Sequence, residues 1–92
     1  MKIYWDEEKN TQIKIKRGIG FEEIESIIVS DALFSIKDHP NSTKYPHQKI
    51  IYVQKDDYII AIPCVPHEDW YFCKTLFPSR KATKKILYPN KK

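Results

Sequence analysis

The chain has 92 residues, 41% of them hydrophobic and 13% aromatic, which is the composition of a folded globular protein and excludes a disordered or collagen-like chain. A chain of this length forms one domain with one modest core, so residues 1–92 are assigned to a single domain, and a large enzyme with several cofactors is excluded. The net charge of +4 conceals an asymmetry, because residues 1–69 hold 9 basic and 12 acidic residues, whereas residues 70–92 hold 7 basic and no acidic ones. This basic end predicts a surface for a polyanion, with a solvated tail as the alternative.

No apolar run is long enough to span a membrane, and the chain begins without the pattern of a signal peptide, so we expect a cytoplasmic protein that does not contact membranes. In such a protein Cys64 and Cys73 are expected to be buried, reduced thiols. Together with His67 they would offer zinc three ligands but no fourth at a familiar spacing. We therefore expect no metal and no cofactor.

The first third of the chain has the pattern of one strand followed by two helices. Residues 2–5 predict a short strand, and residues 6–18 predict a helix with Asp6 as its N-cap and Gly18 just beyond its end. Residues 20–31 predict a second helix, because their apolar side chains recur at helical spacing opposite a run of glutamates. This second helix is expected to pack on the core.

The remainder is β-rich until its last segment. Residues 32–38 predict a strand, and residues 39–47 an exposed loop rich in proline, serine and asparagine. Three further runs, at 48–53, 57–65 and 70–77, are separated by turn-like clusters and predict an antiparallel meander. A short helix is expected to begin after Ser79, with Ala82 and Ile86 facing inward and Leu87 as a further candidate. The predicted fold class is therefore α+β, with two N-terminal helices packed on a small antiparallel sheet and a short C-terminal helix.

Two groups of cations are the candidate functional residues. Arg80 and Lys81 fall in the first turn of the last predicted helix, where the helix dipole already presents positive charge. Cations there cost stability, which makes sense if a bound anion such as phosphate offsets them. Four further cations belong to the hypothesis: Lys84 and Lys85 one turn later, Lys74 on the preceding β-rich run, and Lys14 near the close of the first helix.

The first predicted helix closes with Lys16 and Arg17. If this helix packs beside the meander, its terminal cations meet those of the C-terminal segment across one cleft. Cations at a helix C-terminus also have an ordinary explanation, because they interact favourably with the helix dipole.

Four segments in fixed order resemble one known family: "WDEEKN", "KRGIGFEE", "DHPN" and the closing "PSRKATKK". In order and spacing they are similar to BrnT proteins, the toxins of bacterial type II toxin–antitoxin systems, and the similarity runs over nearly the whole chain. The resemblance implies a RelE-like fold and a ribonuclease that arrests translation by cutting RNA. It also implies a cognate antitoxin, usually with a ribbon-helix-helix DNA-binding domain. Where many members have Lys-His-Gly, this chain has Lys16, Arg17 and Gly18, so a fixed cation replaces an imidazole.

Cutting RNA without a metal requires a base for the 2′-hydroxyl, cations for the charge developing on the phosphate, and a proton for the leaving oxygen. Arg80, with Lys81 and Lys74, is the candidate phosphate clamp, because a guanidinium fork matches two phosphate oxygens. The base stays open between a lysine of lowered pKa, Lys16 or Lys74, and the alternatives Glu22 and His47. Tyr45, in the predicted loop, is the aromatic best placed to stack on an unpaired base.

Overall fold

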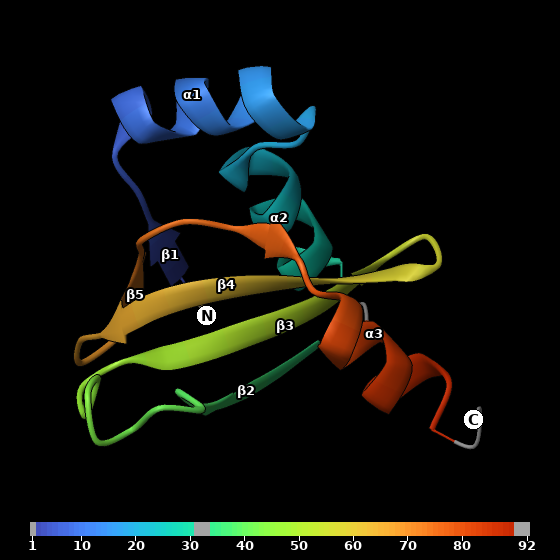
Figure 1. The fold of residues 1–92 in the computed structure, drawn as a ribbon. Helices are drawn as coiled ribbons and strands as arrows, with labels where there is room; N and C mark the ends of the chain where they lie inside the picture. The colour runs from blue at the N-terminus through green and yellow to red at the C-terminus, as the bar shows by residue number, and fades with distance from the viewer. Residues whose placement is uncertain (1, 31–33, 90–92) are drawn as a thin grey trace.

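The computed structural model describes residues 2–30 and 34–89, which form an α+β fold with three helices and a mixed six-stranded sheet (Figure 1). In chain order the elements are β1 (Lys2–Tyr4), α1 (Glu7–Arg17), α2 (Phe21–Val29), β2 (Phe34–Asp38), β3 (Lys49–Lys55), β4 (Tyr58–Pro66), β5 (Trp70–Cys73), β6 (Phe77–Pro78) and α3 (Arg80–Leu87). This order confirms the predicted succession of strands and helices, except that the last predicted strand is divided into β5 and β6. Residues 31–33, which belong to the predicted second helix and following strand, lie outside the described residues.

The sheet has the order β1-β5-β4-β3-β2 and is antiparallel except at one edge. There β1 runs parallel to β5, with Ile3 opposite Tyr71. The prediction of a wholly antiparallel sheet is therefore wrong for β1. Hairpins make neighbouring strands antiparallel, but β1 joins the sheet through a long connection that includes α1 and α2, and such a crossover permits parallel pairing.

The last predicted run, residues 70–77, divides into two strands on one edge of β4. Cys73 pairs with Cys64, whereas Phe77 pairs with Ala61 farther along β4. Between them the chain leaves the sheet, and Leu76 turns into the core with none of its surface exposed. Burying this leucine explains why one apolar run forms two short strands.

The ends of α1 are set by its capping residues, as the sequence predicts. The Asp6 carboxylate accepts the Glu8 N–H at 2.8 Å, which satisfies one of the free donors of the first turn. Gly18 ends the helix at φ 73°, in the left-handed region that favours glycine. The chain thus turns sharply between α1 and α2.

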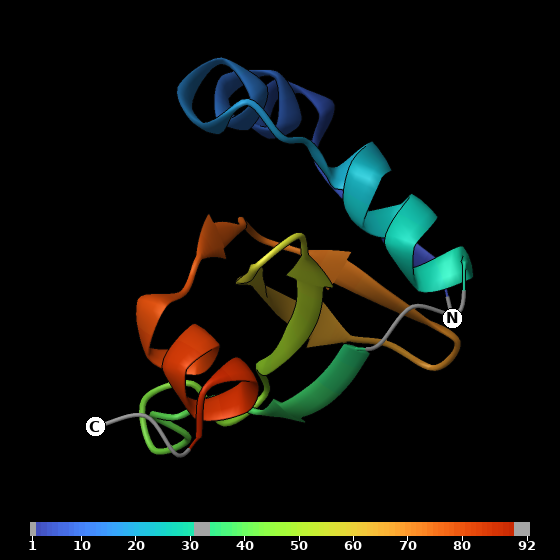
Figure 2. The ribbon, with the colours of Figure 1, turned by 90° about the vertical axis from the view of Figure 1, so that its right-hand side faces the viewer.

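Only one of the two N-terminal helices packs broadly on the sheet. Phe21, Ile24 and Ile28 of α2 are buried in the same core cluster as Ile51 of β3 and Ile62 of β4. From α1 the cluster takes Ile13 alone, and Ile15 is 83% exposed. The expectation that both helices pack on the sheet is therefore wrong for α1, which has too few apolar residues and lies farther from the sheet than α2 (Figures 1 and 2).

The short helix α3 covers the other face of the sheet. Side chains alternate between the faces along a strand, so Ile59 and Ala61 of β4 point away from the cluster that holds Ile60 and Ile62. Thr83 is buried against this second face, where its hydroxyl accepts the Ile59 N–H at 2.9 Å. Ala82 is buried as expected, whereas Ile86 is 37% exposed, so the prediction that Ile86 faces inward is wrong.

Within the described ranges, no helix is both long and apolar enough to cross a membrane.

Candidate functional site

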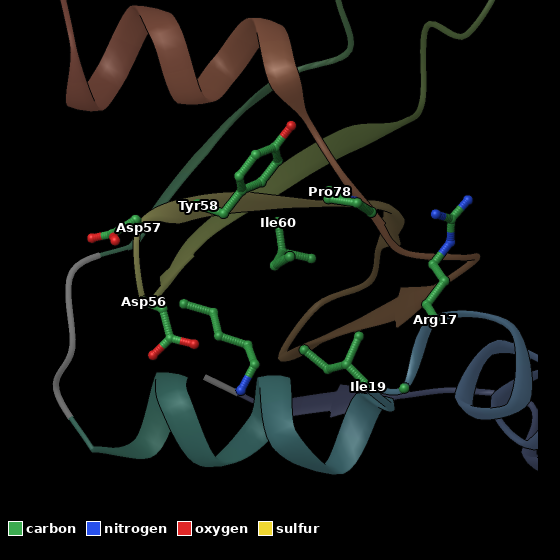
Figure 3. A pocket seen from close by; sticks show the side chains of 9 residues that line it. Arg17, Ile19, Asp56, Asp57, Tyr58, Ile60 and Pro78 are labelled. Carbon is green, nitrogen blue, oxygen red and sulfur yellow. The ribbon is translucent and has the colours of Figure 1, made fainter.

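A pocket of about 360 Å³ lies where the end of α1, the β3–β4 turn and β6 approach one another (Figure 3). Ile19 and Ile60 are the buried apolar residues of its lining, and Pro78 is an exposed one. The remaining lining residues are Arg17, Gly18, Lys55, Asp56, Asp57 and Tyr58. The pocket therefore combines an apolar floor with charged groups at its rim.

The turn at Gly18 separates Arg17, at the rim of the pocket, from Ile19, in its floor. Arg17, the last residue of α1, stays exposed, whereas Ile19 is only 7% exposed and belongs to the core. In Figure 3 the Arg17 side chain rises beside the segment that carries Pro78. The end of α1 thus supplies both a cation for the rim and an apolar side chain for the floor.

The opposite rim is the two-residue turn between β3 and β4. Lys55 and Tyr58 face each other in the ladder, and Asp56 adopts φ 54°, which aspartate tolerates better than most residues. The Lys55 ammonium forms an ion pair with Glu23 of α2, and the hydrogen bond that it donates to this carboxylate raises the Lys55 pKa. This pair ties the turn to α2.

Of the two cations in the described pocket lining, Lys55 forms an ion pair within the fold and Arg17 does not. Within residues 2–30 and 34–89 the ion pairs are Lys14–Glu22, Lys49–Asp38 and Lys55–Glu23. None of them includes Arg17, so its guanidinium is available to an external anion. A guanidinium binds phosphate or carboxylate through two parallel hydrogen bonds.

The start of α3 adjoins the same pocket. Pro78 pairs with Ile60, and the next residue, Ser79, donates its N–H to the Ile59 carbonyl at 2.8 Å. The Ser79 side chain then caps α3 by accepting the Ala82 N–H at 3.0 Å. Arg80 therefore begins the helix two residues after a residue of the pocket lining, and both it and Lys81 are exposed.

Lys14 and Glu22, two further candidate site residues, bind each other within the fold. Lys14 Nζ lies 2.9 Å from Glu22 Oε2, and Asn10 Nδ2 donates to Glu22 Oε1, also at 2.9 Å. The hydrogen bond from Asn10, and after it that from Lys14, lowers the pKa of Glu22 to about 2. So low a pKa makes Glu22 a weak base, and Lys14 is already occupied by its carboxylate.

Tyr45 and His47 lie at the other end of the sheet from the pocket. They precede Lys49, which is six residues from Lys55 along β3 and hence ~20 Å from it at the rise of a strand. Tyr45 packs against His39, with ring centroids 4.5 Å apart, and is half-buried. The structure does not bring these two candidates to Arg80 and Lys81.

The other predicted cations lie nearer. The Lys74 N–H donates to the Pro63 carbonyl, three residues along β4 from Ile60 and so ~10 Å from the pairing site of Pro78. Lys16 is exposed one position before Arg17, and Lys84 and Lys85 are exposed on the later turns of α3.

Sequence reasoning missed the acidic side of the pocket. Residues 54–57 were interpreted only as a turn, although the run Lys55, Asp56, Asp57, Tyr58 places charged and aromatic groups at one tight reversal. Charges concentrated at a turn were the available signal. No group of three or more His, Cys, Asp or Glu residues among the described positions is arranged to hold a metal ion.

Comparison of the chain with family models, with curated proteins and with solved structures found no match.

Proposed function

We propose that this chain is the toxin of a type II toxin–antitoxin system, a cytoplasmic, metal-independent endoribonuclease with a RelE-like fold similar to that of BrnT proteins. The observation that carries the proposal is that Arg17 and Pro78 line one pocket and that Arg80 follows Pro78 by two residues. Two cationic segments far apart in the chain thus adjoin one cavity. The order of elements and the resemblance of the four sequence segments also support this assignment.

In this proposal the phosphate of the RNA binds between the end of α1 and the start of α3. Arg17 and Arg80 supply guanidinium groups that stabilise the charge developing on the phosphate, and Lys81 adds to the positive field. Lys84 and Lys85 extend contact with the RNA backbone along α3. Lys74, ~10 Å away along the sheet, contacts the neighbouring phosphate.

Between the two lysines the base stays open, because Lys16 and Lys74 are both exposed. The low pKa of Glu22 argues against that carboxylate, and the position of His47 at the other end of the sheet argues against the imidazole.

The same positive surface is where a neutralising antitoxin would dock. An acidic or amphipathic segment covering Arg17, Arg80 and Lys81 would block RNA, and its affinity would fall as salt is raised. The proposed partner is a cognate antitoxin with a ribbon-helix-helix domain, in a toxin–antitoxin hetero-oligomer.

The test is RNA cleavage by the purified protein in the presence of EDTA, with analysis of the product ends. Attack by the 2′-hydroxyl leaves a 2′,3′-cyclic phosphate, which distinguishes this chemistry from that of a contaminating metal-dependent nuclease. The variant with Arg80→Ala and Lys81→Ala is expected to lose cleavage. A matched control with Lys9→Ala and Lys37→Ala removes two exposed cations elsewhere and should cleave like the parent. Intact RNA with the parent protein at high concentration would refute the enzymatic proposal.

A second candidate is a module that binds RNA or an acidic protein without catalysis. It is favoured because the described residues of the pocket lining include no histidine and because the low pKa of Glu22 makes that carboxylate a weak base. RNA binding by the parent protein without any cleavage would identify this second function.

A further inference from the structure

The two ends of the pocket carry opposite charge, and this polarity suggests what it binds. In Figure 3 Arg17 stands at one end and Asp56 at the other, with Ile19 and Ile60 between them. A ligand that carries negative charge throughout would meet the Asp56 carboxylate unfavourably. The pocket suits a ligand that is anionic at one end and rich in hydrogen-bond donors at the other.

The acceptor end is open to a ligand. Among the described residues no hydrogen bond to the Asp56 carboxylate is found, and its charged neighbour Lys55, which Asp56 also attracts, forms its ion pair with Glu23. The neighbouring Asp57 is directed outward in Figure 3, away from the floor of the pocket. Asp56 is therefore the acidic group placed to accept hydrogen bonds from a molecule in the pocket.

The size and floor of the pocket suit a flat heterocycle. A volume of about 360 Å³ is at the small end of the range for ligand pockets. Ile19 and Ile60 offer an apolar surface from which water is easily displaced, while their exposed fractions of 7% and 5% mean that the surrounding core holds them in place.

We propose that this pocket binds a guanine base of the RNA, with its phosphate on Arg17 and its Watson–Crick edge on Asp56. A carboxylate has two acceptor oxygens, and guanine presents two adjacent donors, N1–H and the N2 amino group, whereas the other bases present one donor group on that edge. The inference rests on the proposed function, and it gives the ribonuclease a preference for guanine beside the cleaved bond.

The experiment is a titration of the full-length protein with guanosine, adenosine, cytidine and uridine monophosphates, followed by NMR. The methyl signals of Ile19 and Ile60 are expected to shift with guanosine monophosphate at concentrations about tenfold lower than with the uridine nucleotide, as expected for one bidentate base contact. Asp56→Asn is expected to abolish this preference, since an amide both donates and accepts. Asp57→Asn, its matched control, is expected to retain it.

The inference would be overturned by equal affinity for the four nucleotides, or by signal shifts confined to residues outside the pocket. If the methyl signals of Ile19 and Ile60 shifted with an acidic peptide but with no nucleotide, the inference would also be overturned, and the pocket would be assigned to a protein ligand. Asparagine tolerates positive φ as aspartate does, and mapping on the parent protein needs no variant, so the test does not depend on the folding of Asp56→Asn. Guanine binding without RNA cleavage would refute the proposed enzyme but support this site, whereas cleavage without guanine preference would refute the site alone.

Discussion

The backbone N–H of Ile59 donates a hydrogen bond of 2.9 Å to the Thr83 hydroxyl, which joins the centre of the sheet to helix α3. The same hydroxyl donates to the Ser79 carbonyl at 2.6 Å, and the Ser79 N–H returns to the Ile59 carbonyl. One threonine thus satisfies a backbone donor that would otherwise be buried without a partner. This arrangement holds the start of α3, and with it Arg80, against β4 beside the pocket.

Replacing Thr83 by valine is expected to lower the free energy of unfolding by ~1–3 kcal/mol, because a buried N–H loses its acceptor while side-chain volume is kept. Denaturation in urea measures the change. Thr11→Val is the matched control, since the Thr11 hydroxyl donates to the Glu7 carbonyl on an exposed surface of α1, and its loss should change stability by less than ~0.5 kcal/mol. Equal effects of the two substitutions would contradict the role given to Thr83.

The second prediction concerns Gly20, which has no side chain and lies close to the side chains that connect α1 with α2. A Cβ at this position would meet Lys14 Cε at 2.5 Å and both Asn10 Oδ1 and Glu22 Oε1 at 2.8 Å. The half-exposed Lys14 and Glu22 side chains can move aside, but Asn10 is buried and accepts the Phe21 N–H. Gly20→Ala is therefore expected to cost ~1 kcal/mol by displacing this network, measured by thermal unfolding.

Gly18→Ala is its control, because nothing lies within 4 Å of a Cβ there and any cost comes from the positive φ of 73°. The two variants should differ at Glu22. Its pKa should rise in Gly20→Ala, where the network is displaced, and stay low in Gly18→Ala. A Glu22 pKa unchanged by Gly20→Ala would show that the network tolerates the added methyl group.

The limits of what the sequence predicts are visible at α1. Its capping residues Asp6 and Gly18 act through neighbours two to four positions away, so both boundaries were predictable from local pattern. The hydrogen bond between Asn10 and Glu22 was not predictable, because Asn10 lies 12 positions earlier and meets Glu22 only after the turn at Gly18. Glu22 was therefore expected to act in catalysis, whereas the structure gives it hydrogen bonds within the fold.

The same distinction explains which parts of the site were predictable. Arg17, Arg80 and Lys81 stand out as unpaired charges in the sequence. The position of the start of α3 near the end of α1, however, depends on the pairing of β6 with β4, which the residue pattern does not specify. Tyr45 and Asp56 are both turn residues in the sequence. Only the register of β3 and β4 shows that Asp56 adjoins the pocket and that Tyr45 lies at the far end of the sheet.

The pH dependence of the network around Glu22 follows from its lowered pKa. The folded-state pKa of about 2 lies below the ordinary value of 4.5, so the contribution to stability is present above pH 4.5 and is lost as pH falls toward 2. Lys14→Gln is expected to raise the Glu22 pKa only in part, because the hydrogen bond from Asn10 is the larger cause. An NMR titration of the Glu22 carboxyl carbon measures its pKa in the parent protein and in the variant. An ordinary Glu22 pKa in the variant would show that Lys14, and not Asn10, is the main cause of the lowered pKa.

The two cysteines are expected to resist thiol reagents until the protein unfolds. Cys64 and Cys73 face each other across β4 and β5 and are at most 1% exposed. Burial raises the pKa of the Cys64 thiol to about 11 and that of Cys73 to about 12, so the reactive thiolate is scarce near neutral pH. Labelling with a disulfide reagent along a urea gradient should follow the unfolding transition for both residues. Fast labelling of either cysteine in the native protein would contradict their burial.

Removing the cations at the start of α3 is expected to affect stability and RNA binding in opposite directions. Arg80 and Lys81 stand in a first turn that holds no acidic residue, so their charge opposes the helix dipole. Replacing both by alanine should leave the free energy of unfolding unchanged or raise it by up to ~1 kcal/mol. The anchoring of the helix through Thr83 is independent of these side chains.

For single-stranded RNA, loss of two phosphate contacts should reduce the slope of log affinity against log salt by ~1.4. The matched control is Lys9→Ala with Lys37→Ala, which removes the same charge from two exposed positions elsewhere and should leave the slope unchanged. A salt slope that stays the same when Arg80 and Lys81 are removed would show that RNA does not bind at the start of α3. A stable protein with a reduced slope is the result expected if those cations serve the ligand rather than the fold.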